Sequence, residues 1–202
     1  MTPRRADARR AVGAAWFTIG YNVVEGVVAI TGGVIAGAVS LVGFGVDSGI
    51  EVAAAAVVLV RLSAELRGEE PDERTEHIAL RFIAVTFFAL AVYLVIGGTR
   101  DLIVGERPEI SPVGIVLTAA SIVIMPLLAW YKRRIGRRLG SRLVLADAAE
   151  TALCAALSVS TFIGLVAYAA LGWTWIDPVA GFVIALFALN GGREAWSGEH
   201  DD

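Results

Sequence analysis

The chain has 202 residues, of which 56% are hydrophobic and 18% charged, and its mean hydropathy is +0.69. Water-soluble domains are rarely this apolar, so the composition predicts a membrane protein. A formal net charge of -3 gives no basic surface for nucleic acid. The single cysteine excludes an intrachain disulfide and a zinc-finger type of thiolate cluster.

Six apolar stretches are long enough to cross a bilayer, whose hydrocarbon core of about 30 Å requires roughly 20 helical residues. We therefore predict an all-α polytopic membrane protein with six transmembrane helices. The predicted helices lie at about residues 11–34, 40–61, 80–104, 111–131, 142–170 and 177–195. The predicted organisation is a cytoplasmic N-terminal arm at 1–10, a six-helix transmembrane domain at 11–196 and a short cytoplasmic tail at 197–202.

The basic residues lie mainly on one side of the predicted spans. Only Arg100 and Arg107 fall on the other side, and the run KRRIGRR at 132–138 joins the fourth and fifth spans. Loops rich in Lys and Arg stay in the cytoplasm. This distribution predicts that both termini are cytoplasmic in a multi-pass protein of the cell membrane.

Acidic residues interrupt the apolar spans without a basic partner inside those spans. They are Glu25, Asp47, Glu51, Asp147 and Glu150. One carboxylate at the bilayer centre costs about 2.5 to 3.5 kcal/mol. We therefore expect these groups to be protonated, hydrated or neutralised by a bound cation.

Two of the spans each carry their polar side chains on one helical face. Asp47 and Glu51 are four residues apart on the second span, and Glu150 and Cys154 are four apart on the fifth. At about 1.5 Å per residue, the two pairs overlap in height near the middle of the membrane. If the two helices are neighbours, these four O and S donors can enclose a divalent transition metal tetrahedrally.

Other polar residues of the spans are expected to support the ligands or relay protons. They are Asp147, Thr151, Asn22 and Glu25. On the far side of the second span from its acids, Gly45, Gly49 and Ala53 form a row of small residues. Such a row permits close packing against another helix.

These motifs resemble the cation diffusion facilitator family, whose members export zinc and related divalent metals in exchange for protons. SLVGFGVDSGIEV, at 40–52, is similar to the family's second helix, in which an acid or His precedes an acid by four residues. ADAAETALC, at 146–154, matches the frame of an ADxxHxxxD run on the fifth helix. Glu150 stands where His is usual and Cys154 where Asp is usual, which leaves the choice of metal open.

The resemblance covers nearly the whole chain and implies further properties. It implies a homodimer and a central bundle of the first, second, fourth and fifth helices, with the third and sixth to the side. It also implies proton-coupled efflux of a zinc-like divalent cation, which would be the substrate, and no prosthetic group. The family's usual C-terminal cytoplasmic domain is expected to be missing, because the chain ends soon after the sixth span.

Two other classes of function remain open from the sequence. A membrane subunit that binds metal or regulates a partner without transport would use the same acids. An intramembrane aspartyl protease needs two facing aspartates, which Asp47 and Asp147 resemble superficially. In the protease pattern, however, the Asp directly follows the second Gly, and here Val46 intervenes. We therefore expect a protein that is not an enzyme.

Overall fold

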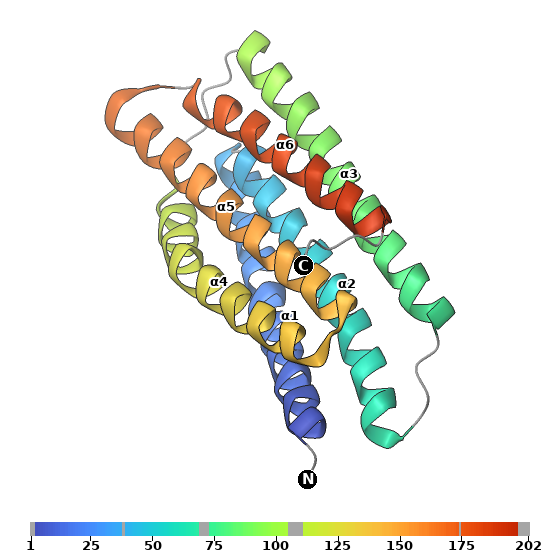
Figure 1. The fold of residues 1–202 in the computed structure, drawn as a ribbon. Helices are drawn as coiled ribbons and strands as arrows, with labels where there is room; N and C mark the ends of the chain where they lie inside the picture. Colours follow the sequence, from blue (N-terminus) through green and yellow to red (C-terminus); the bar gives the residue numbers. More distant parts are fainter. Residues whose placement is uncertain (1–2, 38, 69–72, 105–110, 174, 198–202) are drawn as a thin grey trace.

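The structure is a computed structural model that describes residues 3–37, 39–68, 73–104, 111–173 and 175–197. All regular structure in these ranges is helical, which confirms the predicted all-α class (Figure 1). The helices are α1 (Pro3–Ala36), α2 (Val39–Arg67), α3 (Glu73–Val104), α4 (Pro112–Leu139), α5 (Arg142–Leu171) and α6 (Ile176–Ser197). Residues 1–2 of the predicted arm and 198–202 of the predicted tail lie outside the described residues.

Four helices form a central bundle and two lie to the side. α1 packs on α2, α4 packs on α5, and the two pairs are joined through α1 with α4 and α2 with α5. α3 and α6 run side by side along one flank (Figure 1). This is the arrangement that the family resemblance implied. By length and composition α1 to α5 can each cross a membrane, and α6 occupies the sixth predicted span.

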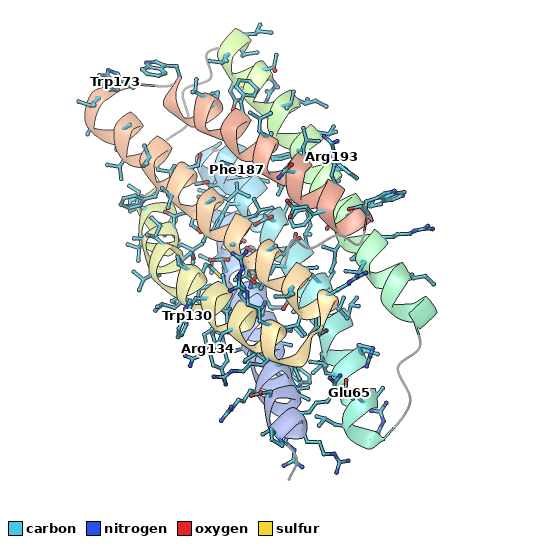
Figure 2. All side chains as sticks on the ribbon, viewed as in Figure 1. Glu65, Trp130, Arg134, Trp173, Phe187 and Arg193 are labelled. Atoms are coloured by element: carbon cyan, nitrogen blue, oxygen red, sulfur yellow. The ribbon has the colours of Figure 1, made fainter. Side chains whose placement is uncertain are left out.

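Aromatic side chains lie near the ends of the bundle, as is typical of membrane interfaces. Trp173 follows the end of α5 and stacks on Trp175, with ring centroids 6.0 Å apart. Trp173 and Glu65 lie toward opposite ends of the molecule (Figure 2). On α4 the Arg134 guanidinium lies 5.5 Å from the ring centroid of Trp130. The apolar surface between these ends suits a lipid environment.

Helix α4 is two turns longer than the predicted fourth span. Ser111 caps its first turn by accepting a hydrogen bond from the Gly114 amide, and Gly140 ends it in the left-handed conformation with φ of 61°. The basic run at 132–138, which was predicted to be a connecting segment, is therefore helical. The prediction failed because the apolar period continues between the arginines. This period puts one face of the run in the interior, with Leu128, Lys132, Ile135, Gly136 and Leu139 buried.

The apolar core has two parts, and the membrane acids lie between them. On α2, Leu41 and Phe44 belong to one part and Val58 and Leu62 to the other. On α5, Leu143 and Ala146 belong to the second of these parts, and Ala155 and Leu157 belong to the first. The carboxylates thus form a polar layer across the middle of the bundle.

Helices α1 and α2 approach each other closely at Gly45. A Cβ atom at Gly45 would lie 2.9 Å from the Ile30 backbone nitrogen and 3.0 Å from the Gly26 carbonyl oxygen. A Cβ atom at Gly49 would have no atom of a neighbouring helix within 4 Å. Close packing, predicted for the whole row of small residues, is therefore present at Gly45 and not at Gly49.

We expect Gly45→Ala to lower the free energy of unfolding by about 1 to 3 kcal/mol, because the added methyl group would push α1 from α2. Gly49→Ala is the matched control on the same helix, and its effect should stay within about 0.5 kcal/mol. Thermal unfolding of the purified protein in detergent measures both variants. Equal melting temperatures would contradict the close contact.

Candidate functional site

The predicted acidic faces of α2 and α5 lie in one buried layer. Their chemistry-bearing side chains are at most 2% exposed: Asp47, Glu51, Asp147, Glu150, Thr151 and Cys154. The two helices are in contact, and the Thr151 hydroxyl donates a hydrogen bond of 2.6 Å to Glu51 Oε1. The convergence of the two helices, which the sequence predicted only if they were neighbours, is confirmed.

Within the described part of the chain, three carboxylate oxygens of this layer are buried without a hydrogen-bond partner. They are Asp47 Oδ2, Glu51 Oε2 and Glu150 Oε2. The Cys154 thiol is fully buried in the same layer. Leaving a buried acceptor unsatisfied costs about 1 to 3 kcal/mol, and more for a charged group. Such oxygens are satisfied by a proton or by a cation, so the layer has the donor chemistry of a cation site.

A lysine reaches this layer from α4. Lys132 Nζ donates to Asp147 Oδ1 at 3.0 Å and to Thr151 Oγ1 at 2.8 Å, and it lies 3.7 Å from Glu51 Oε1. The side chain is 1% exposed. The expectation that the membrane acids have no basic partner was therefore wrong. The signal in the sequence was the helical spacing of Lys132 from Leu128, Ala129, Ile135 and Gly136, which continues the buried face of α4.

The lysine balances only part of the negative charge in the layer. Asp47, Glu51, Asp147 and Glu150 supply four carboxyl groups, and Lys132 supplies one ammonium group. A buried ion pair is weak evidence of a stabilising role, because removing two charges from water offsets most of their attraction. The remaining carboxyl groups stay available to protons or to a cation.

Glu25 belongs to a separate network of hydroxyl groups. Its Oε2 accepts a hydrogen bond of 2.9 Å from Ser48 of α2, and its Oε1 accepts one from Ser121 of α4. The Ser121 hydroxyl also lies 2.9 Å from the Tyr21 hydroxyl. This network joins α1, α2 and α4, and among the described residues no hydrogen bond links it to Lys132.

Asn22 lies beside this network without joining it. Its Nδ2 donates a hydrogen bond of 3.0 Å to the Thr18 carbonyl oxygen, and its Oδ1 is buried without a hydrogen-bond partner. The supporting residues predicted on α1 therefore make contacts of their own, whereas Thr151 and Asp147 bond directly to Lys132 in the acidic layer.

The four predicted ligands share a layer but do not form a ready-made metal cage. Among the described residues, no group of three or more His, Cys, Asp or Glu side chains is placed to hold a metal ion. Close to Glu51 and Asp147, the cation present is the Lys132 ammonium. Metal ligation by Asp47, Glu51, Glu150 and Cys154 thus remains a prediction.

A family comparison identifies this helical bundle. The model of the cation efflux transmembrane domain matches residues 15–198, which is most of the chain. The chain belongs to the cation efflux family. The resemblance to cation diffusion facilitators that the two motifs indicated is confirmed.

The chain is similar to several known members over most of its length. It is 27% identical to the magnetosome protein MamB of Magnetospira sp. (strain QH-2), over 90% of this chain and 62% of that protein. It is 28% identical to the manganese efflux system protein MneS of Bacillus subtilis, over 75% of this chain and 53% of MneS. It is 23% identical to transmembrane protein 163 of Xenopus laevis, over 91% of this chain and 65% of that protein. The cation efflux chain therefore spans about half to two thirds of the length of these relatives.

Proposed function

We propose that this cation efflux protein moves divalent metal ions across a membrane through the acidic layer between α2 and α5. The observation that carries the proposal is the set of three partnerless carboxylate oxygens buried at the middle of the bundle. Family membership supports it, as does the relative MneS, which is named as a manganese efflux system protein. Since this is a family of transporters, it gives no support to the aspartyl protease alternative.

In this proposal Asp47, Glu51, Glu150 and Cys154 supply the ligands. Carboxylates and a thiolate bind metal only in their deprotonated forms, so protons and metal compete for the same atoms. Proton-coupled efflux follows if the site alternates between the two sides of the membrane. Protons arriving from outside would displace the metal, and the cytoplasm would remove those protons after the return. Rocking of helices about the site provides a route for this alternation.

The proposed substrate is a zinc-like transition metal, because three carboxylates and one thiol form a mixed hard and soft ligand set. The proposed setting is the cell membrane, with both termini in the cytoplasm and two copies forming a homodimer. The aromatic side chains near the bundle ends and the basic residues of α4 support the membrane orientation. No prosthetic group takes part in this scheme.

The test is a flux assay in proteoliposomes loaded with a metal-sensitive dye. Zn²⁺, Mn²⁺, Co²⁺ and Ni²⁺ are each added under two opposite pH gradients, with protein-free liposomes as the control. We expect sustained uptake of at least one metal, with a rate that changes when the proton gradient is reversed. A metal-binding subunit without transport would instead give stoichiometric uptake that ignores the gradient, and this result would reject the proposal.

The role of Cys154 in metal choice is tested by Cys154→Asp, which makes the ligand set all-oxygen. Carboxylates favour Mn²⁺ over softer metals, whereas a thiolate favours Zn²⁺. We expect the ratio of Zn²⁺ to Mn²⁺ transport to fall by about 10-fold, the loss typical when one group tuning a metal site is changed. Cys154→Ser serves as the control for size. An unchanged ratio in Cys154→Asp would mean that the thiol does not contact the ion.

A further inference from the structure

Lys132 contacts two carboxylates of the acidic layer, one closely and one at a longer distance. Its ammonium lies 2.9 Å from Asp147 Oδ2 and 3.0 Å from Asp147 Oδ1, so it spans both oxygens of that carboxylate. Its distance to Glu51 Oε1 is 3.7 Å. The lysine is therefore anchored on Asp147, and Glu51 is its more distant carboxylate neighbour.

Thr151 links the lysine to Glu51 through two hydrogen bonds. The ammonium has only donors, so the Thr151 hydroxyl accepts from Lys132 and uses its own proton for Glu51 Oε1. This chain turns one Glu51 oxygen toward α5 and the lysine. The other oxygen, Oε2, is the buried atom without a hydrogen-bond partner. Lys132 thus lies close to Glu51, a carboxylate that the proposed transport requires.

We infer that Lys132 is a tethered cation that competes with the transported metal for Glu51 and thereby sets the affinity of the site. This inference rests on the proposed metal transport. In the metal-free protein, the ammonium offsets the charge of Asp147 and part of that of Glu51. A divalent ion that binds Glu51 meets this positive charge and must displace it toward Asp147. The competition weakens binding, which favours release of the ion.

The two functions open to Lys132 make opposite predictions about metal affinity. If the lysine only neutralises Asp147 as a structural partner, removing the pair leaves metal binding unchanged or weaker. If it competes for Glu51, removing the pair strengthens binding. The substitutions Lys132→Met and Asp147→Asn together delete one positive and one negative charge, so the net charge of the layer stays the same.

The experiment measures binding of Zn²⁺ and Mn²⁺ to the purified full chain in detergent by titration calorimetry. We expect Lys132→Met/Asp147→Asn to bind at least one of the two metals about 10-fold more tightly than the wild type, the scale of effect seen for groups that tune metal sites. Asp147→Asn alone should bind about 10-fold more weakly, because the lysine loses its anchor and moves onto Glu51. Lys132→Gln/Asp147→Asn repeats the test with a polar replacement.

Arg4→Met is the matched control, because Arg4 also pairs with a carboxylate, Glu65 at 2.8 Å, on the surface of the bundle. Its metal affinity should equal that of the wild type. If the double variants bind no more tightly than the wild type, the competition is refuted. If the wild type and every variant bind neither metal and show no flux, the proposed function itself fails, which is a different result.

Discussion

Glu51→Gln should lower divalent metal transport at least about 100-fold, beyond the range typical for groups that merely support a ligand. Glutamine keeps the size of the side chain and can still accept the hydrogen bond from Thr151 through its oxygen. Its amide nitrogen would take the place of the partnerless oxygen, which removes both the negative charge and the lone pair offered to the metal. Flux into dye-loaded proteoliposomes measures the effect.

The control is Glu65→Gln, the same chemical change on the same helix but outside the acidic layer, where the partly buried Glu65 pairs with Arg4 and Arg61. It should transport at the wild-type rate. Asp47→Asn should behave like Glu51→Gln, because Asp47 also has a buried oxygen without a partner. Melting temperatures of the variants distinguish lost transport from lost folding. Full transport by the double variant Asp47→Asn/Glu51→Gln would show that transport does not depend on these two carboxylates, which contradicts the proposed mechanism.

Asp147→Ala should reduce the free energy of unfolding by about 3 to 5 kcal/mol, the usual cost of removing one partner of a buried ion pair. The substitution leaves the Lys132 ammonium buried, with Glu51 3.7 Å away as the nearest remaining carboxylate contact given by the structure. Adding Lys132→Met should recover most of the loss, because the buried ammonium that lost its close partner is then removed as well. Chemical unfolding in detergent, followed by circular dichroism, measures the three proteins.

The comparison for this prediction is Asp7→Ala. Asp7 is partly buried and pairs with two exposed arginine side chains, Arg10 at 2.9 Å and Arg138 at 3.8 Å. Such pairs contribute about 0 to 1 kcal/mol, so the variant should unfold almost like the wild type. If Asp147→Ala were no more destabilising than Asp7→Ala, the buried contact with Lys132 would not contribute to the free energy of unfolding.

The helices and the membrane acids could be predicted from the sequence alone. Apolar stretches of sufficient length define six spans, because the bilayer thickness is a fixed physical limit. The four-residue spacings on the second and fifth spans define two polar faces, because the period of a helix does not depend on its neighbours. The two motifs at 40–52 and 146–154 then indicated the family, which the family model confirms.

Helix length at α4 was harder to predict because two signals conflict in one segment. The run at 132–138 carries five basic residues, which indicates a cytoplasmic loop, and also an apolar helical period, which indicates a buried face. Tertiary packing resolves the conflict. Contact with α5 buries one face of α4, and the arginines at 133–134 and 137–138 stay exposed on the other.

The sequence by itself determined that the chain is helical, spans a membrane and carries acids at its centre, since composition and local period are enough for each conclusion. Only the tertiary structure decided which groups meet. In that structure Lys132 of α4 pairs with Asp147 of α5. Glu25 accepts hydrogen bonds from Ser48 and Ser121. The close approach of α1 and α2 is at Gly45 and not at Gly49. These pairings depend on how each helix is rotated and shifted against its neighbours, and no single helix contains that information.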